Sequence, residues 1–307
     1  MRPALSIVFF TVSSGAGLGL IALLVLADLL QPGGGLTSRQ VLTGGVLSLA
    51  LVAAGLVSST LHLANPKNAW RAFSRFATSW LSREAVLAVA FFAAALAYLA
   101  GAAGLHEVQG LRTACAVLTL LLAWAVLYCT AMIYASLKPI RQWHTPLTPL
   151  AYLVLGHASG ALLMLWVAGR GETRTGPFVA LALALLAAGA VAKLAYYAHA
   201  RQSGGLGLGD ALGVKTAAQV KLLDAGHTHG TFLTSEFVFR LARAHARRLR
   251  ACVWVLGFAL PAALAAAFPD AALAAFLLCF AGLLAERWLF FAEARHTVTL
   301  YHGAQRA

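Results

Sequence analysis

The chain has 307 residues, of which 61% are hydrophobic and 11% are charged, and its mean hydropathy is +0.80. A soluble domain is about 45–50% apolar and about 25% charged. The composition therefore excludes an ordinary soluble globular protein and indicates an integral membrane protein. The formal net charge of +13 would suit a nucleic-acid binder, but the basic residues gather on one side of the predicted membrane spans, which argues against that class.

Eight apolar stretches are long enough to cross a bilayer, which takes about 17–25 residues in a helix. Because backbone groups in lipid must be satisfied internally, we expect each stretch to be helical. The predicted fold is an all-α polytopic membrane protein in which residues 1–307 form a single domain with eight transmembrane helices. The predicted spans are Ser6–Leu30, Val41–Leu63, Glu84–Leu105, Arg112–Ser136, Thr148–Ala168, Gly176–Ala198, Ala251–Phe268 and Ala271–Phe291.

An internal repeat would divide the domain into two four-helix halves, 1–147 and 148–307. Two pairs of segments are similar: Ser14–Ala16 with Ser159–Ala161, and Ser79–Val86 with Thr231–Val238. Each pair lies four spans apart, so the two halves would have the same orientation. In the alternative interpretation, Ser82 and Thr234 are simply helix N-caps, each followed by an acid in the first turn.

The basic residues set the expected orientation. With eight spans, both termini and the second–third, fourth–fifth and sixth–seventh connections lie on one side of the membrane. Of the 23 Lys and Arg, those outside the spans fall on this side except Arg39, Arg112, Arg170 and Arg174. By the positive-inside rule, both termini should face the cytoplasm.

A histidine and a glutamate flank the second–third connection. His62 lies where the second predicted span ends, and Glu84 lies where the third begins. A histidine titrates near neutral pH, and a nearby carboxylate can orient it or relay its proton. Quinone reduction takes up protons at a membrane interface, so the pair indicates quinone chemistry. In the alternative, His62 caps its helix and Glu84 pairs with Arg83 or Arg71.

The same region resembles a known family. The run LVSSTLHLANPKNAWRAF, followed by SWLSREAV, is similar to the membrane anchor subunits of dimethyl sulfoxide reductase-type molybdoenzymes, as is the closing segment ERWLFFAEARHTVTLYHG with Arg287. The resemblance covers nearly the whole chain. It implies a membrane-anchor domain that exchanges electrons between ubiquinone or menaquinone and a four-cluster iron–sulfur subunit, which serves a catalytic subunit with molybdopterin.

The resemblance also implies roles for individual residues. His62 matches the family's quinol-site histidine, Glu84 matches its glutamate, and Arg71 matches a basic residue that lies near the head group. Ser59 and Trp80 lie in the same motifs and complete the candidate quinone-binding set. The resemblance implies no catalytic residue for the terminal substrate in this chain.

The side of the membrane on which the loop after His62 is expected indicates which branch of this family the chain resembles. Dimethyl sulfoxide reductases usually face the periplasm, whereas the loop after His62 lies on the basic side. The resemblance is therefore closer to the cytoplasm-facing, sulfite-oxidising branch, whose anchors begin with a helix similar to SIVFFT. It implies a bacterial inner-membrane protein that delivers electrons from sulfite to quinone. One alternative is an anchor that oxidises menaquinol for a dimethyl sulfoxide or related reductase. Another is a secondary transporter using Lys193, Glu286 and Arg287.

A basic stripe precedes the seventh span. Arg240, Arg243, Arg247 and Arg250 follow one another at three- and four-residue steps on a long helix that starts near Thr234, so they share a face. They could contact lipid headgroups or form a docking surface for an acidic cytoplasmic partner.

The spacing of the cysteines and histidines gives little support for a metal or haem site. The four cysteines lie in apolar spans without the close spacing of an iron–sulfur cluster site. The resemblance implies that iron–sulfur clusters and molybdopterin are bound by the partner subunits only. His157 could ligate haem b together with His199 or His296. The related anchors lack haem, and we expect neither haem nor a metal ion here.

Overall fold

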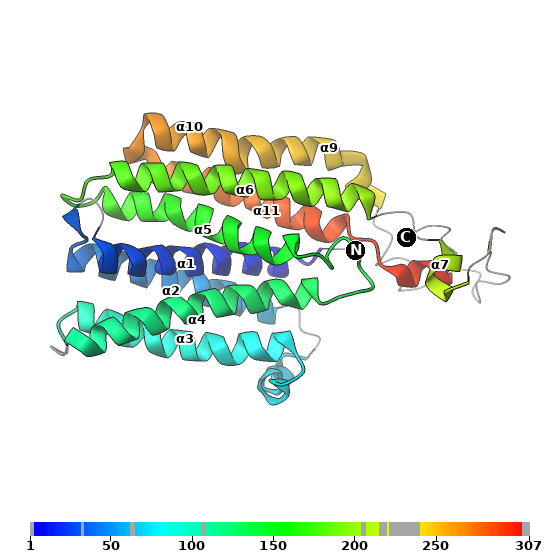
Figure 1. Ribbon diagram of the computed structural model, residues 1–307, viewed down its shortest axis with the longest axis horizontal. Coiled ribbons are helices and arrows are strands. Elements are labelled where there is room, and N and C mark those ends of the chain that lie inside the picture. The colour runs from blue at the N-terminus through cyan, green and yellow to red at the C-terminus, as the bar shows by residue number, and fades with distance from the viewer. Residues whose placement is uncertain are drawn as a thin grey trace.

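The computed structural model describes residues 3–31, 34–61, 65–105, 109–203, 207–214, 220 and 240–302. These residues contain eight helices that are long and apolar enough to span a membrane, and no strand occurs among them. The expected all-α class with eight spans is confirmed. The long helices run side by side along the longest axis of the molecule (Figure 1).

The helix boundaries lie close to the predicted ones. The spans are α1 Leu5–Leu30, α2 Ser38–Thr60, α3 Trp80–Ala102, α4 Gln109–Ala135, α5 Leu147–Ala168, α6 Gly176–Gln202, the composite α9 Arg240–Trp254, η3 Val255–Ala259 and α10 Leu260–Ala267, and α11 Ala272–Ala292. The short elements are η2 Pro66–Arg75, α7 Leu208–Leu212, η4 Pro269–Ala271 and η5 Thr297–His302. Helix α3 begins before Glu84, so this residue lies inside the span rather than at its first position.

The seventh span changes its helical type next to a proline. Residues Val255–Ala259 form a π-helical turn directly before Pro261. Proline cannot donate a hydrogen bond to the carbonyl four residues earlier, and a local π turn is one of the adjustments that re-satisfy the freed backbone groups in membrane helices. The span nevertheless continues as helix to Ala267.

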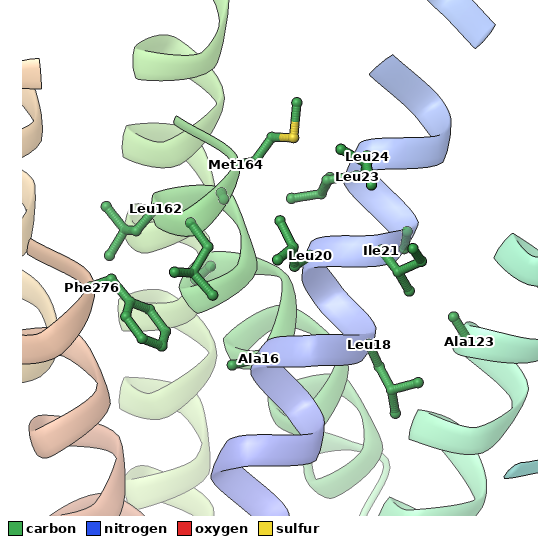
Figure 2. Packing of buried hydrophobic residues seen from close by; sticks show 14 of the residues in the cluster. Ala16, Leu18, Leu20, Ile21, Leu23, Leu24, Ala123, Leu162, Met164 and Phe276 are labelled. Carbon is green, nitrogen blue, oxygen red and sulfur yellow. The ribbon is translucent and has the colours of Figure 1, made fainter. Parts of the chain in front are cut away.

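Helices α1 and α5 form the centre of the bundle. Helix α1 is the most buried of the spans, and α5 is the next. Helix α1 packs against α2, α4 and α5, and α5 also packs against α6 and α11. Figure 2 shows Leu23 and Leu24 of α1 close to Met164 of α5, while Leu162 lies on the other side of α5, near Phe276 of α11.

Small residues allow these two helices to approach closely. The similar segments Ser14–Ala16 and Ser159–Ala161 lie on α1 and α5 respectively. A Cβ atom on Gly160 would collide with the backbone of Gly19 and Leu20. Such small residues are typical of close helix packing in membranes. The segments therefore have a packing role, while the internal repeat itself stays a prediction.

Gly160→Ala is expected to destabilise the bundle by about 1–3 kcal/mol, because an added methyl group meets backbone that has no room to move. Thermal unfolding of the purified protein in detergent would measure the change. Gly110→Ala is the matched control, since a Cβ at Gly110 of α4 meets nothing within 4 Å. An equal loss in both variants would contradict the close approach of α1 and α5.

Candidate functional site

The loop that should carry the quinone-site histidine is described only in part. His62 lies outside the described residues, so its role stays a prediction. Ser59 lies in the last turn of α2 and donates a hydrogen bond to the Leu56 carbonyl at 2.7 Å. Arg71 lies in η2 with an exposed side chain near the ring of Trp70, 5.9 Å from its centroid.

A serine pair fixes the start of α3 against η2. Ser79 is the N-cap, and its side chain accepts a hydrogen bond from the Ser82 backbone N–H at 3.4 Å. The expectation that Ser82 is the cap is wrong, because Ser82 lies within the first turn. Its hydroxyl instead accepts from the Arg75 backbone N–H at 3.0 Å and donates to the Ala72 carbonyl. These bonds hold η2 close to the first turn of α3.

Glu84 lies on the second turn of α3 and is only 3% exposed. Its carboxylate accepts a hydrogen bond from the Thr130 hydroxyl of α4. Among the described residues it forms no ion pair with Arg83 or Arg71. The Glu84 carboxyl is therefore a buried acid whose observed partner is a neutral hydroxyl, which differs from the ion-paired alternative.

Arg83 points away from Glu84. Its guanidinium lies 4.3 Å from the ring centroid of Trp80 and donates to the carbonyls of Phe76 at 3.0 Å and Ala77 at 2.7 Å. Trp80 also makes an edge-on contact with Tyr128 of α4, with ring centroids 5.9 Å apart. A tryptophan and an arginine thus lie beside the end of α3, as is common at a membrane–water interface.

The Thr130 hydroxyl can serve both protonation states of Glu84. A hydroxyl has one proton to donate and can also accept. In the structure it lies within hydrogen-bond distance of Glu84 Oε1 and, at 3.0 Å, of the Val126 carbonyl. It can donate to an ionised Glu84, or turn to Val126 and accept from a protonated one. The local geometry therefore permits Glu84 to gain and lose a proton without leaving its partner unsatisfied.

A buried ion cluster lies on α6 and α11. Lys193 pairs with Glu286, and Arg287 Nε donates to Glu286 Oε2 at 2.5 Å. All three side chains are at most 5% exposed. The Lys193 Nζ lies 4.1 Å from the ring centroid of Tyr196. Pairing of this kind is what charged groups within a membrane require.

Aromatic side chains connect the Glu84 region with this ion cluster. Tyr134 follows Thr130 by one turn of α4, and its ring stacks on Tyr152 with centroids 5.8 Å apart. The Arg287 guanidinium lies 4.1 Å from the ring centroid of Tyr152. Tyr152 and Arg287 also line a cavity of about 20 Å³, which has room for about one water molecule. Aromatic contacts thus extend from Tyr134, one turn after Thr130, to Arg287 of the ion cluster.

Lys193, Glu286 and Arg287 stand out in the sequence as charged residues within spans, whereas Thr130, Tyr134 and Tyr152 do not stand out. A threonine or tyrosine near a span end is common, so these residues carry no distinctive signal. Their role follows only from the packing of α3, α4 and α5.

The histidines proposed for haem have other partners. The ring of His157 on α5 accepts from Trp124 Nε1 at 2.9 Å through Nε2, and its Nδ1 lies 2.7 Å from the Leu153 carbonyl. His199 lies in the last turn of α6, whereas His157 lies in the middle of α5. The two histidines are therefore several helical turns apart along the bundle. The described residues contain no group of three or more His, Cys, Asp or Glu side chains suited to a metal ion. The absence of haem stays a prediction.

The arginines of the basic stripe differ in their surroundings in the structure. The side chains of Arg240 and Arg243 lie outside the described part of α9. Arg247 is exposed, whereas Arg250 pairs with Glu293 of α11 at 2.5 Å. One of the four arginines thus faces a neighbouring helix, and docking of a partner by this stripe stays a prediction.

Comparisons with known proteins place the chain within a family. Residues 1–292 match the model of the DMSO reductase anchor subunit (DmsC). The chain is also similar to a sulfite dehydrogenase subunit of Allochromatium vinosum, with 36% identity over 324 aligned positions that cover 98% of this chain and 99% of that protein.

Proposed function

Because this chain belongs to the DMSO reductase anchor subunit family, we propose that it is the quinone-reactive anchor of a heterotrimeric oxidoreductase. Its partners are a four-cluster iron–sulfur subunit and a molybdopterin catalytic subunit, whose cofactors supply the electrons. In the proposed direction, sulfite is oxidised at the cytoplasmic face and quinone is reduced in a bacterial inner membrane. The similarity to a sulfite dehydrogenase subunit supports this direction.

The observation that carries the proposal is the buried Glu84 next to the loop that holds His62. Reduction of a quinone to a quinol takes up two electrons and two protons. Glu84 lies in the second turn of α3, near the end of the bundle where η2 and the exposed Arg71 and Arg75 lie. The Thr130 hydroxyl accommodates both forms of the acid. We assign Glu84 the transfer of a proton and His62 the hydrogen bond to the quinone carbonyl.

The distribution of charge supports the orientation. The exposed Arg75, Arg141 and Arg201 follow or precede helix ends at the same end of the bundle as Glu84. Arg39 and Arg170 lie at the opposite end. The positive-inside rule then assigns the Glu84 end to the cytoplasm, where the catalytic partners would bind.

Purification of the complex from its native membrane in mild detergent tests the assignment. We expect two larger subunits to co-purify and sulfite to drive reduction of a water-soluble quinone analogue. The family match also favours a second direction, in which quinol reduces dimethyl sulfoxide or a related acceptor. Co-purified subunits that oxidise quinol but not sulfite would establish that direction instead, and a chain without redox partners would contradict the anchor role.

His62→Ala is expected to leave the complex assembled and to reduce sulfite-dependent quinone turnover by about 10²-fold or more, the usual contribution of a positioned acid–base group. Sulfite oxidation with ferricyanide, which takes electrons directly from the partner subunits, should persist. Wild-type quinone turnover in this variant would show that His62 is not part of the site.

A further inference from the structure

A basic pocket is lined by residues of α6, α9 and α11, at the same end of the bundle as Glu84. Figure 1 shows these three helices in the same part of the bundle. The pocket's volume of about 480 Å³ falls within the range of about 300–1,000 Å³ that is usual for small-molecule sites. Its polar wall includes Gln142, Tyr197 and four arginines: Arg201, Arg247, Arg250 and Arg295. None of these residues belongs to the candidate quinone site.

The pocket has more cationic groups than it can neutralise. Glu293 is the acid among its lining residues, and it already pairs with Arg250 at 2.5 Å. Arg201, Arg247 and Arg295 are exposed, and none of them forms an ion pair within the described parts of the chain. The pocket therefore carries a net positive charge and favours an anionic occupant.

Two buried donors also lack an acceptor. Arg250 Nε and the Tyr197 hydroxyl are buried and have no hydrogen-bond partner within the described residues. The two side chains are neighbours, because the Arg250 guanidinium lies 5.5 Å from the ring centroid of Tyr197. A buried donor without a partner is costly. A phosphate oxygen would supply acceptors to both, and guanidinium groups bind phosphate with two parallel hydrogen bonds.

The position of the pocket favours a phospholipid, rather than a soluble phosphate, as its occupant. Leu289 and Phe290 of α11 give the pocket an apolar side, and they lie deeper in the span than Glu293 and Arg295, which follow them at the end of α11. Arg201 lies in the last turn of α6, Arg295 follows the end of α11, and Arg247 and Arg250 lie in the second half of α9. An apolar side next to several arginines suits a glycerophosphate headgroup with its acyl chains. Basic pockets between transmembrane helices on the cytoplasmic side are typical sites for such headgroups.

We propose that this pocket binds the phosphate group of an anionic phospholipid, and that the lipid holds α9 against α6 and α11. Arg250 and Tyr197 donate to the phosphate, while Arg201 and Arg295 neutralise its charge. The inference does not depend on the redox direction. For Arg250 it favours the lipid headgroup over the acidic protein partner, the two alternatives that the sequence left open for the basic stripe.

Titration of the delipidated complex with dioleoylphosphatidylglycerol tests the proposal, with binding followed by native mass spectrometry and by the thermal midpoint. We expect saturable binding that raises the midpoint, and no such effect with dioleoylphosphatidylcholine. The Arg201→Gln/Arg295→Gln double variant keeps Arg250 and its ion pair, and should bind the anionic lipid at least about tenfold more weakly. Arg75→Gln removes an exposed charge from η2, at the same end but outside the pocket, and should bind like the wild type.

Three results would overturn the proposal. An equal loss of affinity in Arg75→Gln would indicate unspecific attraction to a basic surface. Equal protection by inorganic phosphate at matched concentration would assign the pocket to a soluble anion. Unchanged lipid binding in the double variant, together with loss of the iron–sulfur subunit, would make the same arginines a protein-docking surface. Failure of the quinone assay would leave this lipid result unaffected, so the two proposals can fail separately.

Discussion

Replacement of Glu286 by glutamine is expected to lower the stability of the membrane domain by about 3–5 kcal/mol, the usual effect of removing one partner from a buried ion pair. Glu286 is fully buried and is the carboxylate that pairs with both Lys193 and Arg287. Its loss leaves two cations inside the bundle without a counter-charge. Thermal unfolding in detergent, monitored by the fluorescence of the tryptophans, would measure the shift.

Glu293→Gln on the same helix is the matched control. Glu293 also pairs with a cation, Arg250, but both side chains are partly exposed, at 24% and 36%. Solvent screens such a pair, and we expect a loss of at most about 1 kcal/mol.

A second substitution separates pairing from packing. Lys193→Met, added to Glu286→Gln, removes one of the two unpaired cations and should recover part of the lost stability. A double variant no more stable than Glu286→Gln alone would show that the Lys193–Glu286 pair contributes little, and that the packing of the Glu286 side chain dominates.

The sequence predicts the spans well because lipid imposes a simple requirement. Every backbone group must be satisfied within the segment, so a long apolar stretch is a helix. The residue at which a helix begins is harder to predict, as the two serines near the start of α3 illustrate. Both Ser79 and Ser82 are good N-cap residues by type, and the choice of Ser79 reflects the contact of Ser82 with η2, which lies outside the helix.

Pairing between helices is not visible in the sequence. The spans carry apolar residues all round, so periodicity does not show which face of α3 meets α4. The burial of Glu84 could be expected from its place near a span, but its contact with Thr130 could not. For Lys193 and Glu286 the cost of charge in lipid predicts that each has a partner, and only the fold shows that they pair with each other.

Glu84→Gln is expected to reduce quinone turnover of the complex by about 10²–10⁴-fold, because glutamine keeps the shape of the side chain but cannot carry a proton. Sulfite oxidation with ferricyanide should stay at the wild-type rate. Loss of both activities would indicate failed assembly, and retention of quinone turnover would remove Glu84 from the proposed proton route.

Thr130→Val tests whether the partner of Glu84 positions it. Thr119→Val is the matched control, because both threonines are buried on α4 and bond the carbonyl four residues earlier, but only Thr130 also contacts Glu84. We expect Thr130→Val to shift the pH profile of quinone turnover, since the hydroxyl interacts differently with the two protonation states of the acid. Thr119→Val should keep the wild-type profile. An identical change in both variants would mean that the hydroxyls serve the helix alone, and that Glu84 does not depend on Thr130 for its chemistry.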